Sequence, residues 1–193
     1  TDLMARVVAL VLMLVAAGAA RAEDTYPART VEIVVPFAAG GGTDLIARVL
    51  IEQLAASLHQ RFIVINRPGA STNIGADIVA KSKPDGYTIL SADNAVLAFN
   101  EHLFSKLPFN PEKDFSYIGA IGKFPLALVV HPDFPAKNFK EFLAYVKANP
   151  GKVNYASPGN GSPHHLAMEM FKVRTGTFIT HIPYRGAAPA MAD

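Results

Sequence analysis

Apolar and polar residues alternate along the chain in blocks of two kinds. Short runs rich in β-branched residues are followed by longer segments in which apolar residues recur every three or four positions. The predicted strands are 31–35, 62–65, 87–90, 126–130, 153–156 and 178–182, and the predicted helices are 44–58, 73–81, a segment opened by 138, 163–175 and a last one begun at 187. Strands that alternate with helices are typical of parallel sheets covered by helices. The pattern therefore predicts an α/β fold.

Some of these helices carry further signals. In the helix 44–58, apolar residues three and four apart are interleaved with charged ones, which predicts an amphipathic helix lying on a sheet. Asn138 with Glu141 predicts an N-cap and its partner at the third helical position. Ser162 with Pro163 predicts an N-cap followed by a proline at the first helical position.

Two glycine-rich turns, 36–44 and 156–163, follow predicted strands and open predicted helices. Each places unpaired backbone N–H groups at a helix N-terminus, where anions bind. Because the turns belong to different halves of the chain, we expect them to face a cleft that closes on a carboxylate. The candidate binding residues are Phe37, Ala39, Gly40, Gly41, Gly42, Thr43 and Asp44 in the first turn, and Ser157, Gly159, Asn160, Gly161 and Ser162 in the second.

The first turn lacks the fingerprints of the common nucleotide sites. A dinucleotide motif that started at Gly40 would need glycine at Leu45, and the next strand ends on Asn66 rather than on an acid. A phosphate loop would need a Gly-Lys-Ser/Thr triplet, and Asp44 would repel a phosphate. The turn fits a weaker anion or ordered water, and the alternative is a plain turn with Thr43 as N-cap.

The second turn carries donors that suit a planar anion with two oxygens. Ser157, Asn160 and Ser162 add side-chain donors to the amides of Gly159 and Gly161. The alternative is that Ser162 caps the helix and has no other role. A nucleophile elbow is excluded, because the serine lacks the flanking glycines of that motif.

Two further groups are candidates for the far end of the cleft. Asp93 and Asn94 follow a predicted strand, where a doubly wound sheet places ligand contacts; otherwise they cap a helix. Tyr184, Arg185 and Gly186 form a turn after the last predicted strand. Arg185 either pairs with a second carboxylate or is solvated.

The histidines do not form a recognisable metal site. His164 and His165 are adjacent, so on a helix they point about 100° apart, and no third ligand lies at a known spacing. We expect His181 to be a hydrogen-bonded residue of the core or the cleft edge. The competing hypothesis is a periplasmic hydrolase or transferase that uses His181, although no nucleophile, base and acid stand at a usable spacing.

Phe37 is either core or a lid over an apolar ligand body.

Composition excludes several classes of protein. The chain has no Cys, which excludes thiol catalysis, zinc bound by Cys, and disulfides. The formal net charge of +2 includes two arginines of the N-terminal segment, so the rest is near neutral. Nucleic acid is therefore not an expected partner.

Residues 1–22 have the pattern of a signal peptide. Arg6 precedes an uncharged run over 7–20, and Ala20-Arg21-Ala22 fits a cleavage site. The run of about 14 residues is shorter than the roughly 20 that span a bilayer, which disfavours the alternative of an N-terminal anchor. Export without disulfides predicts a periplasmic protein.

The motifs, taken in order along the chain, resemble a known family. They are Tyr26-Pro27, the segment 31–44, Asn66-Arg67-Pro68-Gly69-Ala70, Asn73-Ile74-Gly75-Ala76-Asp77, Pro84-Asp85-Gly86-Tyr87-Thr88, Leu107-Pro108-Phe109 with Lys113-Asp114-Phe115, Asn154-Tyr155-Ala156-Ser157 with Gly159-Asn160-Gly161-Ser162, and His181-Ile182-Pro183-Tyr184-Arg185-Gly186. They closely resemble the Bug family, the TctC-like extracytoplasmic solute receptors of tripartite tricarboxylate transporters. The match covers essentially the whole chain after the signal peptide.

This resemblance implies a type II periplasmic-binding-protein fold, with two lobes of mostly parallel sheet and flanking helices that close over a small organic carboxylate. The first turn is implied to act through amides and ordered waters, and the second through direct contacts. The resemblance also implies no catalysis, no cofactor, a monomer, and delivery to membrane subunits like TctA and TctB.

The resemblance also predicts how the chain is divided. Residues 23–120 are expected to form the N-terminal part of lobe 1 and 121–193 an incomplete lobe 2, in a C-terminally truncated chain, because family members are longer. Two departures stand out: Ser71-Thr72 replace a commonly glycine-rich stretch, and Pro158 stands where Ser is frequent, which puts one hydroxyl contact in doubt.

Overall fold

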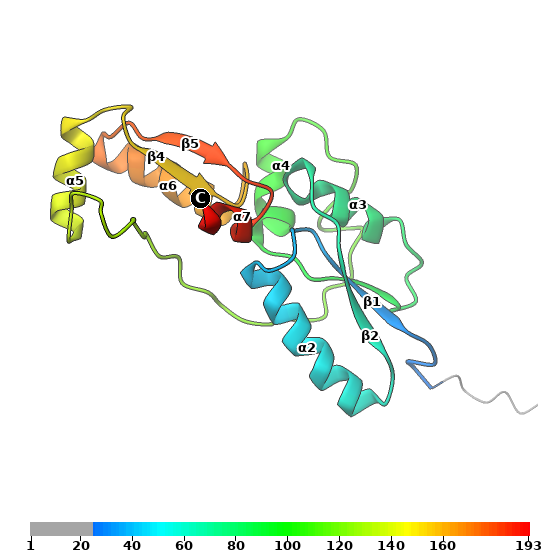
Figure 1. The fold of residues 1–193 in the computed structure, drawn as a ribbon. Helices are drawn as coiled ribbons and strands as arrows, with labels where there is room; N and C mark the ends of the chain where they lie inside the picture. The colour runs from blue at the N-terminus through cyan, green and yellow to red at the C-terminus, as the bar shows by residue number, and fades with distance from the viewer. Residues whose placement is uncertain (1–24) are drawn as a thin grey trace, which may run out of the picture.

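The computed structural model describes residues 25–193, and the predicted signal peptide lies outside the described residues. Strands and helices alternate as predicted, and the two sheets lie in separate halves of the molecule (Figure 1). Within residues 25–193, no helix is long and apolar enough to cross a membrane.

The first half is built on a parallel sheet of order β2-β1-β3. Its elements are β1 (Val31–Val35), α2 (Gly42–Leu58), β2 (Phe62–Asn66), the 3-10 turn η1 (Ala70–Thr72), α3 (Asn73–Ala80), β3 (Thr88–Leu90), the π-helical segment η2 (Ala95–Phe99) and α4 (Asn100–Leu103). The central strand β1 pairs on both edges, so that Val34 lies opposite Ile65 and Leu90. A central parallel strand is buried on both faces, which explains why β1 is a nearly continuous apolar run.

Apolar clusters cover the two faces of this sheet. Ile33 and Val35 pack with Phe37 and Ala47 on the side of α2. The other cluster joins Ala76 of α3 to residues of η2 and of the loop after α4. Phe37, which precedes the glycines by three residues, is therefore a core residue and is 9% exposed.

The second half holds a two-stranded parallel sheet, β4 paired with β5. Its elements are α5 (Phe139–Ala148), β4 (Asn154–Ser157), α6 (Pro163–Thr175), β5 (Thr180–Pro183) and α7 (Ala187–Ala192). Phe142 and Val146 of α5 pack with Ile179 in its core. In the register of the strands, Tyr155 lies opposite His181.

The two predicted helix caps are confirmed, whereas the alternative for the first turn, a cap by Thr43, does not hold. Asn138 Oδ1 accepts from the Glu141 amide at 3.0 Å, and Ser162 Oγ accepts from the His165 amide at 3.2 Å. Thr43 is not the N-cap of α2, because the helix begins earlier, with Gly41 at the cap position and no side-chain cap bond.

The predicted strand 126–130 is not formed. Residues 115–131 have no regular secondary structure, and this segment runs from the first half to α5 (Figure 1). Its apolar side chains are exposed, with Ile118 at 82% and Val129 at 65%. A strand needs a neighbour to complete its backbone hydrogen bonds, and among the described residues no strand pairs with this segment.

Candidate ligand-binding site

A cavity of about 420 Å³ lies between the two halves of the molecule. Its walls are the end of β1 and the loops that follow the other strands, the edge where open parallel sheets bind ligands. The lining residues are Pro36, Phe37, Pro68, Gly69, Ala70, Ser71, Thr72, Ile74, Ala95, Pro158, Gly159, Asn160, Ser162, Pro183, Tyr184 and Arg185. No acidic side chain is among them, so the cavity suits an anion better than a cation.

The structure brings only part of the predicted site to this cavity. The predicted residues that line it are Phe37, Gly159, Asn160, Ser162, Tyr184 and Arg185. Those that do not line it are Ala39, Gly40, Gly41, Gly42, Thr43, Asp44, Asp93, Asn94, Ser157, Gly161 and Gly186. The second turn and the turn 184–186 that follows β5, called the third turn, therefore meet at the cavity, whereas the glycines of the first turn do not line it.

The glycines of the first turn allow close contact with α7. A Cβ atom at Gly40 would lie 3.4 Å from the Ala188 Cβ, and one at Gly41 would lie 3.6 Å from the Ala187 Cβ. Gly186, with φ of 137°, sits where the third turn passes the first. These glycines thus join the two halves beside the cavity.

The Asp44 carboxylate lies inside the first turn and is hydrogen-bonded to it. It is 1% exposed and accepts from the Gly40 amide at 2.9 Å, from Asn66 Nδ2 at 2.8 Å and from Arg48 Nε at 2.9 Å. Burial by itself raises the pKa of Asp44, but the bonds from Arg48, Gly40 and Asn66 outweigh it and hold the pKa below its ordinary value. The carboxylate therefore stays charged and occupies a turn amide that had been assigned to a ligand.

The loop after β2 is a wall of the cavity that the sequence analysis did not predict. Gly69, Ala70, Ser71 and Thr72 all have positive φ, at 128°, 46°, 52° and 77°. Three consecutive non-glycine residues in this region are strained, and such strain concentrates at binding sites. The sequence signal was Pro68-Gly69 after the carboxyl end of a strand.

Asn100 at the start of α4 holds this loop in place. Its Nδ2 donates to the Ser71 carbonyl at 2.8 Å and to Asn73 Oδ1 at 2.7 Å. Asn100 is fully buried, and its Oδ1 has no hydrogen-bond partner among the described residues. The conformation of the loop thus depends on a residue far away in the sequence.

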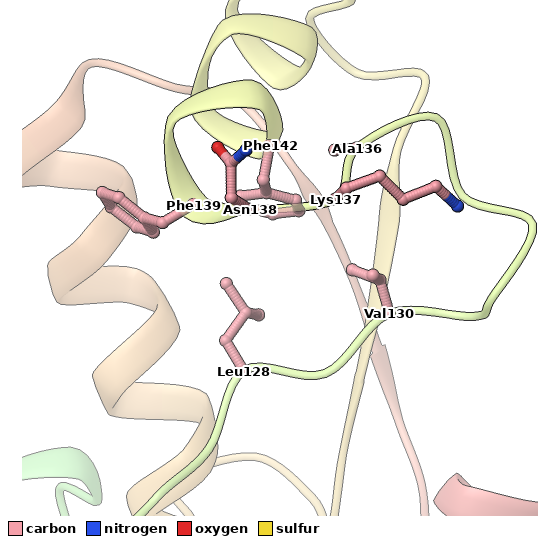
Figure 2. Close-up of a pocket in the computed structure, with 7 residues that line it drawn as sticks. All are labelled: Leu128, Val130, Ala136, Lys137, Asn138, Phe139 and Phe142. Carbon is pink, nitrogen blue, oxygen red and sulfur yellow. The ribbon is translucent and has the colours of Figure 1, made fainter.

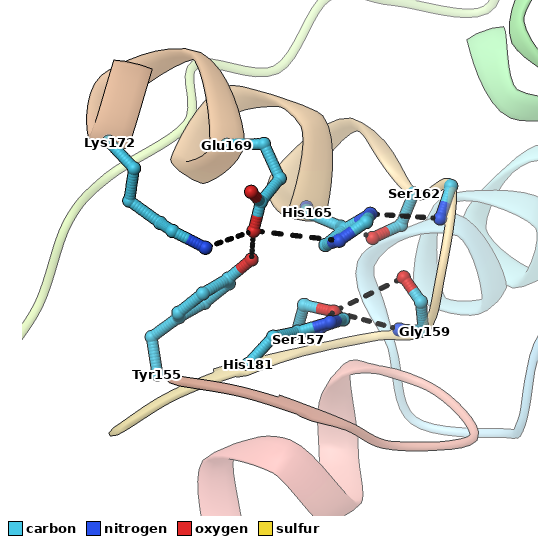
Figure 3. Close-up of polar contacts among 9 residues, drawn as sticks. Tyr155, Ser157, Gly159, Ser162, His165, Glu169, Lys172 and His181 are labelled. Carbon is cyan, nitrogen blue, oxygen red and sulfur yellow. Dashed lines mark hydrogen bonds and ion pairs between the residues drawn. The ribbon is translucent and has the colours of Figure 1, made fainter. Parts of the chain in front are cut away.

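Ser157 in the second turn is buried and hydrogen-bonded within the protein. It is 1% exposed, its Oγ lies 2.7 Å from His181 Nε2, and it accepts from the Gly159 amide at 3.1 Å (Figure 3). A serine beside a histidine is the start of a hydrolase site, but a nucleophile must be accessible and its histidine needs an acid. Here the serine is buried, and among the described residues no acid is hydrogen-bonded to His181.

Ser162 both caps α6 and lines the cavity. Its oxygen accepts from the His165 amide, so the hydroxyl proton is left for a group in the cavity. The neighbouring Gly161 amide donates to His165 Nδ1 at 3.1 Å, so this predicted donor is already occupied.

Asp93 and Asn94 behave as residues of a helix start. Asp93 Oδ1 accepts from the Ala95 amide at 2.9 Å, and burial raises the pKa of Asp93. Ala95, not either polar residue, lines the cavity.

A second cavity, of about 240 Å³, lies beside α5 (Figure 2). Leu128 and Val130 face the N-terminal turn of α5 across it, where Phe139 and Phe142 lie. None of the predicted site residues lines this cavity.

As for metals, no group of three His, Cys, Asp or Glu residues within 25–193 is arranged to hold one.

Known proteins match this chain along most of its length. Residues 46–193 match the model of the tripartite tricarboxylate transporter family receptor, TctC. A UPF0065 protein of Bordetella pertussis is 42% identical over 186 residues, which cover 96% of this chain and 57% of that protein. Protein BugT of the same organism is 43% identical over 171 residues, which cover 88% of this chain and 52% of BugT. The chain thus spans little more than half the length of these relatives.

Solved structures agree in fold. The R. palustris protein Rpa4515, solved with adipate, has a TM-score of 0.85 and 36% identity over 87% of this chain and 56% of its own. MatC from Rhodopseudomonas palustris, with bound malate, has a TM-score of 0.76 and 33% identity over 86% of this chain and 57% of its own. The predicted periplasmic-binding-protein type of α/β fold is confirmed, and the chain belongs to the TctC family of tripartite tricarboxylate transporter receptors.

Proposed function

We propose that this protein is a solute receptor, not an enzyme, and that it binds a small organic carboxylate in the 420 Å³ cavity between its halves. The observation that carries the proposal is the lining of that cavity. It combines hydroxyl and amide donors with the guanidinium of Arg185 and contains no acid. An anion would find partners there, whereas a cation would meet only dipoles and one like charge.

The N-terminus of α6 is the best place for the first carboxylate. The helix spans Pro163–Thr175, and Ser162 at its cap lines the cavity. Its positive dipole end and the Ser162 hydroxyl would act on the same anion. Asn160, which also lines the cavity, offers an amide donor.

The remaining walls of the cavity suit the apolar carbon chain of a ligand and a second carboxylate at its other end. Phe37, Ile74 and Pro158 provide apolar surface, and Arg185 makes no ion pair among the described residues. A guanidinium binds a carboxylate with two parallel bonds. The related structures hold adipate and malate, which are both dicarboxylates. A dicarboxylate is therefore the ligand class that the cavity fits best.

Isothermal titration calorimetry with adipate and malate tests this proposal. Hexane-1,6-diamine, with charges of opposite sign on a chain of six carbons, is the matched control. We expect a carboxylate to bind and the diamine to give no heat, and a ligand at 100 times its Kd to stabilise the protein by about 2.7 kcal/mol. Diamine binding, or turnover of carboxylate esters by the purified protein, would overturn the proposal.

The same proposal includes export and delivery. Membership in a family of transporter receptors supports a location in the periplasm and transfer of the ligand to membrane subunits like TctA and TctB. Uptake of radiolabelled ligand by cells with and without the gene tests this step. Unchanged uptake after deletion, with its loss on deletion of another receptor, would contradict it.

A further inference from the structure

Two histidines stack directly behind the second turn. The rings of His165 and His181 lie 4.2 Å apart with an interplanar angle of 20°. The Tyr155 ring stacks on His181 as well, at 4.7 Å and 19°. The two histidines come from α6 and β5, so this stack joins a helix to the sheet below it (Figure 3).

Each histidine holds one polar group of the turn. His165 Nδ1 accepts from the Gly161 amide at 3.1 Å, and His181 Nε2 lies 2.7 Å from the Ser157 hydroxyl. Ser157 in turn accepts from the Gly159 amide, so the bonds reach both ends of the turn. These bonds fix the positions of the cavity-facing atoms of the turn, and they do so without contact between the bonded groups and a ligand.

The arrangement requires a neutral His165 and disfavours a positive charge on both rings at once. Since the Gly161 N–H donates to His165 Nδ1, a proton on that nitrogen would set two donors against each other. A proton on His181 Nε2 would reverse its bond to Ser157, and two imidazolium rings 4.2 Å apart would repel.

The neighbouring charged groups, Glu169 and Lys172, come from α6, and the neutral Tyr155 hydroxyl comes from β4. His165 Nε2 is 3.8 Å from Glu169 Oε1, which also accepts from Lys172 Nζ and the Tyr155 hydroxyl, each at 2.7 Å. Lys172 therefore shares the negative charge that would otherwise favour an imidazolium. Burial lowers the pKa of both histidines, and His165 and Lys172 lower the pKa of His181 further, against the opposing effect of Glu169.

We propose that His165 and His181 are positioning residues of the binding site, which as a neutral stacked pair hold the Gly161 amide and the Ser157 hydroxyl and so fix the turn 157–162 for ligand binding. This inference rests on the proposed carboxylate site. Because a lowered pKa means that the unfolded chain takes up protons first, the stability from this pair is full above the ordinary histidine value and falls as the pH drops below it. Affinity for the carboxylate should fall in the same window.

Phenylalanine replacements separate stacking from hydrogen bonding. His165→Phe and His181→Phe keep an aromatic ring but remove the acceptor, and His164→Phe is the control, since His164 is exposed and none of the described hydrogen bonds involves its side chain. With adipate and malate as probes, the first two variants should bind about 5- to 10-fold more weakly at pH 7.5, and the control should bind like the wild type. The loss of affinity from pH 7.5 to 5.5 should be smaller in the double variant than in the wild type, and the difference between the two profiles reports the titration of His165 and His181.

Nitrogen-15 NMR of the imidazoles in the ligand-free protein gives a result that does not depend on the ligand. At pH 7.5 His165 should be the neutral tautomer with its proton on Nε2. A proton on Nδ1, or wild-type affinity and pH profile in both phenylalanine variants, would overturn the positioning role. If the wild type binds neither probe while the tautomer is as expected, the dicarboxylate proposal fails and the role of the pair in shaping the turn stands.

Discussion

Removing the buried carboxylate of Asp44 should damage the first turn more than any other single change there. Asp44→Ala deletes the acceptor of the Gly40 amide and one of the two acceptors of Asn66 Nδ2, which keeps only its bond to the Phe37 carbonyl at 3.0 Å. Hydrogen bonds to a charged group are worth about 1.5–3 kcal/mol each, and because Asn66 keeps a second acceptor we take the lower end of this range, about 3 kcal/mol for the two bonds. The Arg48 side chain is 46% exposed, so its ion pair adds at most about 1 kcal/mol after solvent screening. We expect a loss of about 3–4 kcal/mol in the free energy of unfolding.

Urea unfolding of Asp44→Ala and of a control variant, Asp77→Ala, measures this loss. Asp77 forms an ion pair at the same spacing with Lys81, but their side chains are 26% and 66% exposed. Asp77→Ala should therefore cost only about 0.3–0.5 kcal/mol. In thermal unfolding, the Asp44 variant should melt about 6–16 °C lower than the wild type.

The decrease in the free energy of unfolding at low pH, here called the acid limb, gives an independent check. Because the pKa of Asp44 is held below its ordinary value, its contribution is full above about pH 4 and is lost as the pH falls through the lowered value. Asp44→Asn should flatten this limb. A cost below about 1 kcal/mol for Asp44→Ala, or an unchanged acid limb in Asp44→Asn, would refute the assignment of Asp44 as the group that closes the turn.

Three further predictions concern the second turn and the exposed segment. Gly161→Ala should cost about 1–2 kcal/mol in urea unfolding and weaken adipate binding, because φ is 74° and the new Cβ would lie 2.9 Å from Leu103 Cδ1; a neutral result would contradict the close approach of the two halves. Ser162→Ala should lose about 0.5–2 kcal/mol of stability with its bond to the His165 amide, and about tenfold in affinity by calorimetry; loss of stability alone would leave Ser162 as a cap only. Phe124→Lys should reduce binding of an apolar fluorescent dye without lowering the free energy of unfolding, because Phe124 is 61% exposed, and a large loss of stability would show that it is buried after all.

Local signals in the sequence were sufficient for most of the fold. The run 31–35 was recognisable as a buried strand because a central parallel strand is apolar on both faces. Asn138 and Ser162 were recognisable as caps because the side chain and the amide it accepts from lie three residues apart. The prediction of a strand at 126–130 was wrong because a strand depends on a partner strand, which a local sequence pattern cannot supply.

The order of motifs determined the family, because each of them lies in a contiguous stretch of sequence. The sequence also placed Ser162 and Arg185 in the turns that follow strands, where the cavity is found. It could not show that the loop containing Ser71 would form a wall of that cavity. The positive φ of that loop depends on Asn100, which is distant in sequence.

Only the tertiary structure decided which donors are free for a ligand. A glycine-rich turn offers amides whatever lies beside it, but Asp44 takes the Gly40 amide and His165 takes the Gly161 amide. These partners become known only when the side chains are packed in three dimensions. The physical reason is that anion binding requires unsatisfied donors, and whether a donor is satisfied depends on the whole neighbourhood rather than on local sequence.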